Sequence, residues 1–299
     1  MAEKTLTVFT PTYNRAYCLN NGYEALCRQT VKDFVWIIID DGSTDNTKAL
    51  VEEWMKFDNG FEIRYVYKKN GGMYTAYNEA IRIADTELCV CVDSDDYLTN
   101  DAVEKIVNTW KKYGSKEYAG IVGLDCTPEG EIIGDKFPQQ KVINLIDLLL
   151  GKYRIKNGDR KNVVRTDLYK SVAPMKEFAG EKDFNPHFMH IAISKRYDFL
   201  ILNEKLCVVD YQSDGMSNTI FKQYLRSPRS FREMRLMDMS LEDTPLSFLL
   251  KKTIHYVSSC ILSGEPCVSA SPHKILTILM YPCGILFTLY LKLYAKKEK

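Results

Sequence analysis

The sequence lacks several features that would point to a particular class of protein. It has no C-x-x-C pair among its nine cysteines and only four histidines, so neither a zinc framework nor a disulfide framework is indicated. Its 40 basic and 39 acidic residues leave a formal net charge of +1, which argues against a nucleic-acid-binding protein. No signal peptide precedes the first strand-like run, so we expect a cytoplasmic protein, peripheral at the inner membrane face if its C-terminal region binds lipid.

The first 125 residues instead show a regular alternation of strand-like and helix-like segments. The run at 35–39 is apolar throughout, as expected of a strand that is buried on both faces. The alternation predicts an α/β fold with a mostly parallel central sheet and helices on both faces. The expected strands are 6–10, 35–39, 63–67, 88–92 and 119–124, and the expected helices are 17–29, 75–84 and 101–113, with a further helix over 50–55 that Asp45 or Asn46 would cap.

The C-terminal region has a different composition. Residues 275–291 carry no charge and are followed by lysines at 292, 296, 297 and 299. The uncharged stretch is close to the lower length limit for a membrane span, and Pro282 and Gly284 interrupt it. Two interpretations remain, namely a helical hairpin that lies in the membrane interface against anionic lipid, and a helix of the core or of a dimer.

Polar loops follow the first two expected strands, at the edge where an open parallel sheet binds its ligands. In Thr10-Pro11-Thr12-Tyr13-Asn14-Arg15, Pro11 fixes a turn, the Tyr13 ring can stack on a base, and the Arg15 guanidinium matches a phosphate. In Asp40-Asp41-Gly42-Ser43-Thr44-Asp45, one of the two adjacent carboxylates can accept the imide proton of a uracil ring. Taken alone, each loop is also compatible with an ordinary capped turn.

The next two loops carry glycines and carboxylates. Asn70-Gly71-Gly72 precedes the helix that contains Asn78, and paired glycines at a helix N-terminus let backbone N–H groups approach an anion. Asp93-Ser94-Asp95-Asp96 follows the fourth strand, where three carboxylates repel one another unless a cation neutralises them. Hard oxygen ligands select Mg²⁺ or Mn²⁺, which would bridge the two phosphates of a nucleoside diphosphate. The alternative is an aspartate cluster that caps a helix.

Together these four motifs resemble those of the family 2 glycosyltransferases of the GT-A fold, of the type that builds bacterial cell-surface polysaccharides. The resemblance is close over the first 125 residues and loose over the middle region. It implies a GT-A, Rossmann-like domain, a nucleotide-sugar donor that is commonly a UDP-sugar, and single-displacement transfer with inversion. The expected donor-binding residues are Thr10, Pro11, Tyr13, Arg15, Asp41, Asn70, Gly71, Gly72, Asn78, Asp93 and Ser94, and the expected ligands of Mn²⁺ or Mg²⁺ are Asp95 and Asp93.

An inverting transfer needs a base that takes the proton of the acceptor hydroxyl. In the family this base is an acid in the middle region, often within a Glu-Asp pair. The sequence has Gly180-Glu181-Lys182-Asp183-Phe184 instead, so Glu181 is the first candidate and Asp183 the second. A solvated charged turn is the alternative interpretation of this segment.

We therefore expect a glycosyltransferase domain over residues 1–240, with a nucleotide-sugar-binding half at 1–125 and an acceptor-side half at 126–240. A helical, membrane-associating region would follow at 241–299. The expected reaction moves a hexosyl or N-acetylhexosaminyl group to a saccharide or a lipid-linked saccharide. A nucleotidyltransferase is disfavoured because the loop at 10–15 has no glycine to hold a triphosphate. A non-catalytic nucleotide-sugar-binding module stays open because a clean Glu-Asp pair is missing.

Overall fold

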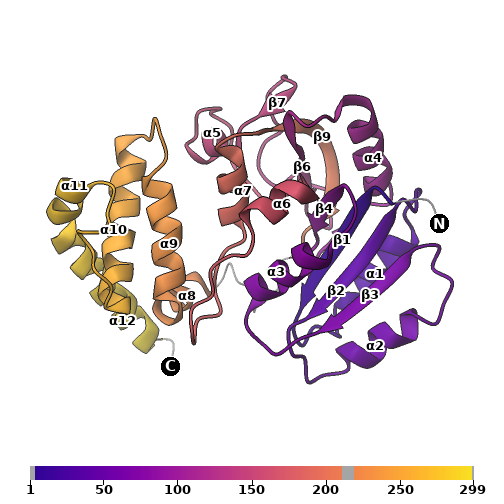
Figure 1. The fold of residues 1–299 in the computed structure, drawn as a ribbon, viewed down its shortest axis with the longest axis horizontal. Coiled ribbons are helices and arrows are strands. Elements are labelled where there is room, and N and C mark those ends of the chain that lie inside the picture. The colour runs from indigo at the N-terminus through magenta and orange to yellow at the C-terminus, as the bar shows by residue number, and fades with distance from the viewer. Residues whose placement is uncertain (1–3, 211–218, 298–299) are drawn as a thin grey trace. The chain divides into compact units, whose positions relative to one another are not determined.

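A computed structural model describes residues 4–210 and 219–297 of the chain (Figure 1). The chain divides into two compact units. The first is formed by Met1–Pro174 and Met189–Gln212, and the second by Met175–Phe188 and Ser213–Lys299.

The first unit is built on one sheet, whose strands in the described residues follow the order β3-β2-β1-β4-β8-β6-β9-β5, with β7 paired to β9. The first four of these strands are parallel, β8 is antiparallel to both of its neighbours, and β6 and β9 are parallel. The prediction of a mostly parallel sheet is therefore confirmed. The strands are β1 (Leu6–Thr12), β2 (Phe34–Asp40), β3 (Glu62–Tyr67), β4 (Leu88–Cys91), β5 (Tyr97–Leu98), β6 (Tyr118–Cys126), β7 (Val142–Ile143), β8 (Arg160–Arg165) and β9 (Asp198–Val208).

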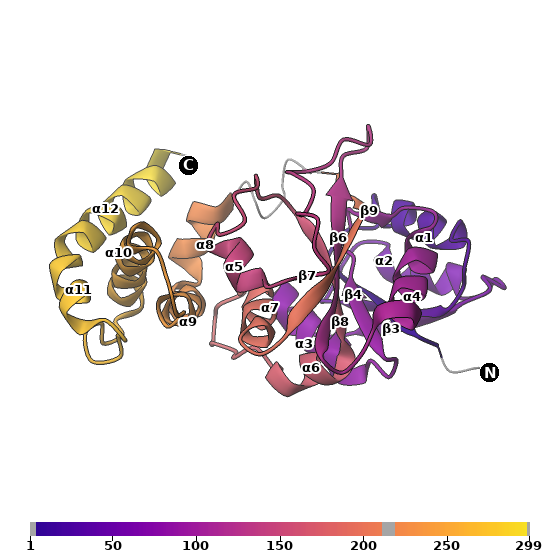
Figure 2. The same cartoon turned by 90° about the horizontal axis from the view of Figure 1, so that it is seen from above.

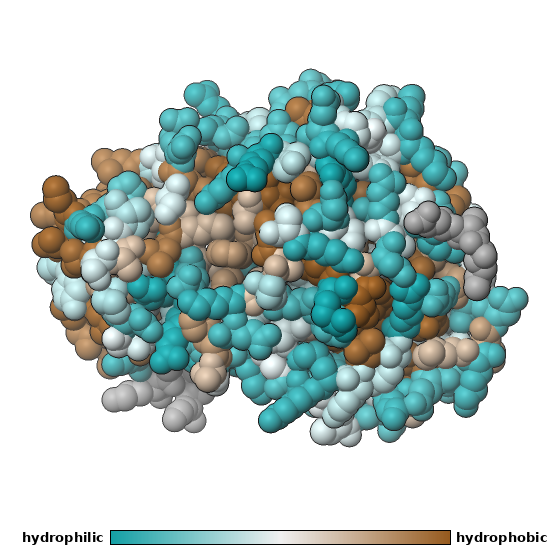
Figure 3. Space-filling view, in the orientation of Figure 1, coloured by the Kyte–Doolittle hydropathy of each residue, from teal (hydrophilic) through white to brown (hydrophobic). Residues whose placement is uncertain are grey.

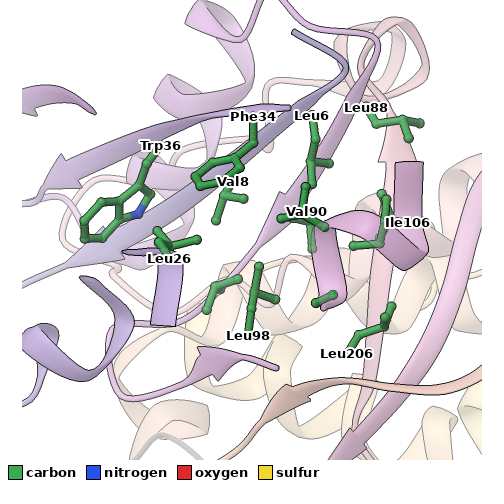
Figure 4. Packing of buried hydrophobic residues seen from close by; sticks show 14 of the residues in the cluster. Leu6, Val8, Leu26, Phe34, Trp36, Leu88, Val90, Leu98, Ile106 and Leu206 are labelled. Carbon is green, nitrogen blue, oxygen red and sulfur yellow. The ribbon is translucent and has the colours of Figure 1, made fainter. Parts of the chain in front are cut away.

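Helices cover both faces of this sheet, as predicted (Figure 2). On one face, Leu26 and Ile106 belong to the same buried cluster as the strand residues Val8 and Trp36 (Figure 4). On the other face, the ring of Tyr77 packs edge-on against Phe9, with centroids 4.7 Å apart. The helices around the sheet are α1 (Leu19–Cys27), α2 (Thr47–Trp54), α3 (Met73–Ile83), α4 (Ala102–Tyr113), α5 (Leu145–Leu149), α6 (Thr166–Val172) and α7 (His187–Ser194).

The second unit is helical in its described residues. Its helices are α8 (Ile220–Arg226), α9 (Pro228–Met239), α10 (Leu246–Ser263), α11 (Lys274–Leu279) and α12 (Tyr281–Lys297). Met239 at the end of α9 shares a small buried cluster with Tyr256 and Val257 of α10. The predicted boundary between residues 240 and 241 thus lies inside this unit, because α9 packs against α10. The division of the chain into a domain at 1–240 and a separate region at 241–299 stays a prediction.

Candidate active site

The polar loops predicted to bind the donor follow strands that end at one edge of the sheet. In the parallel register of β1, β2 and β3, Thr12 lies opposite Asp40, and Asp40 lies opposite Tyr67. The fourth strand pairs with β1 up to Phe9 and Cys91, so the loop that begins at Val92 leaves from the same edge. The sheet therefore brings together four loops that lie far apart in the sequence.

The loops after β1 and β2 are joined to each other by hydrogen bonds. The backbone N–H of Asn14 donates to the Ser43 hydroxyl (2.9 Å), and the Asn14 side-chain oxygen accepts from the backbone N–H of Thr44 (2.8 Å). The Asp45 carboxylate accepts from the backbone N–H of Ala16 (3.0 Å). The two loops thus form one structured unit at the edge of the sheet.

The first of the two adjacent aspartates, Asp40, has a structural role. Its fully buried carboxylate accepts from the backbone N–H of Ser43 (2.7 Å) and from the hydroxyl of Tyr65 (2.5 Å). Burial raises the pKa of Tyr65, and the neighbouring Asp40 carboxylate raises it further. Asp40 therefore holds the turn that follows β2, and ligand recognition by Asp41 stays a prediction.

Asp41 organises the glycine loop. Its buried carboxylate accepts from the Lys68 ammonium (2.6 Å), from the backbone N–H of Gly71 (2.9 Å) and from the backbone N–H of Gly72 (2.7 Å). Lys68 also donates to the hydroxyl of Thr75 in the first turn of α3 (2.7 Å). The anion that the two glycine N–H groups bind in this structure is therefore the chain's own carboxylate. A carboxylate has about four acceptor positions, and these three hydrogen bonds use three of them in Asp41.

The residues expected to contact the nucleoside lie at different depths. Tyr13 is 49% exposed, and its accessible ring could stack on a base. Thr10 is buried, and its hydroxyl accepts a hydrogen bond from the indole N–H of Trp36 (3.0 Å). Arg15 lies beside Tyr17, to whose hydroxyl its guanidinium donates. Thr10 thus faces the protein interior, whereas Tyr13 faces solvent.

A narrow cavity in the first unit brings several of the predicted residues together. Thr10, Asp93 and Ser94 line it, along with the ring of Trp36 and the apolar side chains beneath. Ser94 is buried, and its carbonyl oxygen accepts from the Cys18 thiol. The cavity thus lies between strand β1, helix α1 and the aspartate loop after β4.

The three aspartates of the loop after β4 differ in their exposure to solvent. Asp93 is exposed, Asp95 is half-buried and Asp96 is buried. Burial raises the pKa of Asp96 to about 8, the Lys161 ammonium opposes this shift, and the neighbouring carboxylates add to it. Asp93 and Asp95 are therefore the two carboxylates of this loop that a cation in solution can reach.

Two site residues, Lys161 and Asp125, are not indicated by the sequence. The buried Lys161 ammonium lies 3.7 Å from the Asp96 carboxylate and 4.0 Å from the Asp125 carboxylate. Burial raises the pKa of Asp125 to about 6, and Lys161 opposes the shift. Lys161 therefore offsets part of the negative charge beneath the aspartate loop. For Asp125 the sequence carries only a weak signal, namely its position at the end of an apolar run. For Lys161 it carries none, because the RKNVVR sequence of β8 does not resemble a buried strand.

The carboxylates of this edge fit a cation whose coordination is completed by substrate. Mg²⁺ is usually held by one or two carboxylates together with substrate phosphates and water. Within residues 4–210 and 219–297, no three His, Cys, Asp or Glu side chains converge as a ready-made metal site. Asp93 and Asp95 would supply the two hard oxygen ligands of such a shared site, and this assignment stays a prediction.

The two candidate bases, Glu181 and Asp183, lie in the second unit and both accept hydrogen bonds there. Glu181 accepts from the backbone N–H groups of Arg229 (2.9 Å) and Ser230 (2.8 Å), so it caps the N-terminus of α9. Asp183 accepts two hydrogen bonds from the Arg226 guanidinium (2.5 and 2.7 Å) and one from the Ser227 hydroxyl (2.8 Å). Both carboxylates therefore stabilise the segment that joins α8 and α9, and the alternative interpretation of a solvated charged turn is wrong because both are buried and hydrogen-bonded.

The fold and the loops define an α/β protein whose polar loops gather at the carboxyl ends of the parallel strands, where open α/β sheets bind nucleotides. The model of glycosyl transferase family 2 matches residues 7–164, which include all the strands of that edge. The chain belongs to glycosyl transferase family 2.

Several curated proteins are similar to parts of the chain. The chondroitin synthase of Pasteurella multocida (strain Pm70) is 30% identical over 132 residues, which cover 44% of this chain and 14% of the synthase. The glycosyltransferase GlyA of Streptococcus pneumoniae is 26% identical over 157 residues, 51% of this chain and 22% of the relative. The chain thus spans less than a quarter of the length of either relative.

Solved structures confirm the fold over nearly the whole chain. The structure of S. aureus TarS 1-349 in complex with UDP-GlcNAc has a TM-score of 0.61 at 14% identity and covers 99% of this chain and 92% of that chain. The mannosyltransferase PcManGT from Pyrobaculum calidifontis, in complex with GDP-Man and Mn²⁺, has a TM-score of 0.59 at 14% identity and covers 97% of this chain and 88% of that chain. The predicted GT-A fold is therefore confirmed.

Proposed function

We propose that this protein transfers a sugar from a nucleotide-sugar donor, a UDP-sugar, to a hydroxyl of a saccharide or lipid-linked saccharide. The observation that carries the proposal is the edge of the sheet where the buried Asp41 and the exposed Asp93 follow strands of one parallel register. Membership of family 2 and its relatives in polysaccharide synthesis support the reaction class. The transferred group would be a hexosyl or N-acetylhexosaminyl residue.

In the proposed donor complex, Asp41 accepts the imide proton of the uracil, and Tyr13 stacks on the base. Asp93 and Asp95 would hold Mn²⁺ or Mg²⁺, which would supply charge stabilisation to the departing diphosphate. The Lys161 ammonium offsets part of the negative charge of Asp96 and Asp125, so these two carboxylates add less charge to the site. Among nucleotides, this arrangement favours diphosphates, since two carboxylates leave the remaining coordination positions to phosphate oxygens.

The proposed transfer inverts the anomeric carbon. The acceptor oxygen bonds to that carbon as the bond to the donor phosphate breaks, and a carboxylate takes the hydroxyl proton. Glu181 is the first candidate for this base and Asp183 the second. Glu181→Gln would test the role, because the amide cannot take a proton. Loss of acceptor-dependent turnover with both nucleotide affinity and unfolding stability unchanged would support Glu181, because loss of its cap on α9 would lower the stability, whereas full turnover would remove it.

Calorimetric titration with UDP and GDP, with and without Mn²⁺, tests the donor site. We expect UDP to bind more tightly with Mn²⁺, and this gain to disappear in Asp95→Asn. Glu53→Gln, which removes one exposed acid from α2, serves as the matched control and should keep the metal effect. An unchanged metal effect in Asp95→Asn would overturn the assignment of Asp93 and Asp95. Metal-dependent binding without turnover on any saccharide acceptor would instead indicate a binding module.

A further inference from the structure

The last two helices expose large apolar side chains along one face. Ile275 of α11 is 78% exposed, and Leu286 and Leu293 of α12 are 66% and 60% exposed. Ile278, Leu279 and Leu289 are also more than half exposed. Space-filling atoms coloured as hydrophobic gather at the α11 end of the molecule (Figures 1 and 3). We call these six residues the C-terminal apolar face.

The side of α12 that packs on the rest of the second unit mixes large apolar residues with small and polar ones: Leu291 is 1% exposed, and Phe287 stacks on His255 of α10 with ring centroids 4.4 Å apart. The Thr288 hydroxyl of α12 donates to the Ser258 hydroxyl of α10 (2.8 Å). Gly284 packs so closely on α10 that a Cβ at this position would lie 2.3 Å from a methyl carbon of Val257. A surface helix in water normally buries its apolar side and exposes its polar side. The helix α12 departs from this pattern because it is apolar on its exposed side as well as on its packed side, and its close contacts through Gly284 and Thr288 resemble those of helices that pack within lipid.

Positive charge borders the apolar face. Lys274 at the start of α11 and Lys292 on α12 are both exposed. The sequence from 266 to 297 contains no acidic residue, and lysines also occupy positions 296, 297 and 299. A two-fold contact between copies of this face would bring together two lysine-bearing segments without an acidic residue between positions 266 and 297 to pair with them, so it gains no ion pair from this stretch. Anionic phospholipid headgroups complement this border, and acyl chains complement the face.

No helix in the described residues is both long and apolar enough to cross a bilayer. We propose that α11 and α12 bind the surface of an anionic membrane, with the C-terminal apolar face in the acyl-chain boundary and the lysines at the headgroups. The proposal is independent of the donor site. If the acceptor is lipid-linked, membrane binding would keep the enzyme at the surface that holds this substrate.

Vesicle sedimentation of the full chain tests the proposal. The vesicles are phosphatidylcholine alone and phosphatidylcholine mixed with phosphatidylglycerol in equal parts. We expect binding to the mixed vesicles, and at least about tenfold weaker partitioning for Leu286→Ser/Leu289→Ser/Leu293→Ser, because each leucine loses its transfer into an apolar medium. Met55→Ser/Phe57→Ser, which removes exposed apolar side chains (48% and 59% exposed) from the first unit, should bind as the wild type does.

A fluorescent probe distinguishes insertion from other contacts. Cys27 and Cys283 are both exposed thiols, one in each unit. An environment-sensitive dye on Cys283, in a Cys27→Ser background, should shift its emission to the blue with mixed vesicles, whereas the same dye on Cys27 should not. Absence of binding and of any shift would overturn the proposal. A stable dimer without lipid that the leucine substitutions dissociate would overturn it too, in favour of a second copy.

Discussion

The carboxylate of Asp41 lies 2.6 Å from the ammonium of Lys68, and this ion pair ties the loop after β2 to the loop after β3. The Asp41 side chain is almost fully buried and that of Lys68 is partly exposed, so the pair is shielded on one side only. Because the same carboxylate also holds the backbone of Gly71 and Gly72, a single aspartate sets the shape of the glycine loop before any ligand binds.

Replacing Asp41 with asparagine should weaken nucleotide binding strongly. The amide group would turn an N–H toward donors that now face an oxygen, and hydrogen bonds to charged groups contribute about 1.5–3 kcal/mol each. We expect at least about a tenfold loss of affinity for UDP by calorimetry. Asp58→Asn is the control, because Asp58 accepts one backbone N–H in a turn outside the site. Equal affinities in both variants would contradict the role of Asp41.

A methyl group at Gly42 should disturb the site more than one at Gly60. Both glycines have positive φ angles, +86° and +69°, so alanine is strained at each. At Gly42 a Cβ would also lie 2.8 Å from the backbone nitrogen of Asn70, whereas at Gly60 the nearest atom is 3.6 Å away on the flexible Lys32 side chain. We expect Gly60→Ala to lower stability alone, and Gly42→Ala to lower both stability and nucleotide affinity. Thermal unfolding and calorimetry on both variants would show the difference.

Removing the Glu181 carboxylate should destabilise the second unit. Glu181→Ala leaves the first N–H groups of α9 without their acceptor, and loss of a helix cap costs about 0.5–2 kcal/mol. Denaturant unfolding would measure this loss, with Glu177→Ala, an exposed acid of the same segment, as the control. Nucleotide affinity should be unchanged in Glu181→Ala. A stability equal to that of Glu177→Ala would show that the cap contributes nothing.

The second unit should lose stability in mild acid because of His255. Burial, together with the nearby cations, lowers the pKa of His255 to about 3, and its ring stacks on Phe287 with centroids 4.4 Å apart. The unfolded chain protonates this histidine near pH 6.5 and the folded chain does not, so stability is present above that pH and falls as the pH decreases. The slope from this group is at most about 1.4 kcal/mol per pH unit. His255→Phe, which keeps a stacked ring, should unfold with a shallower pH dependence between pH 6 and pH 4.

The strands and helices of the first 125 residues follow from the sequence alone, except for the short strand β5 (Tyr97–Leu98), which was not predicted. Apolar runs and helical spacing are local signals, and β1 to β4 with α1 to α4 lie where those signals predict them. The loops after these strands had to share one edge once the sheet was parallel, which is why the donor-site motifs could be recognised together. The strand β8 could not be found in this way, since three of the six residues in RKNVVR are basic.

What the tertiary structure decided is the partner of each polar group. Asp41 is thirty residues from the Gly71 N–H that it accepts, and Glu181 is forty-nine from Ser230, so no local pattern encodes either contact. The placement of Lys161 beside Asp96 likewise depends on an antiparallel strand inserted into a parallel sheet. The sequence by itself determined which residues lie in the four loops that follow the strands, because hydrophobic periodicity is local. Only the fold decided which of their carboxylates are buried and held by the protein, as Asp40 and Asp41 are, and which are exposed, as Asp93 is, because that depends on contacts between distant segments.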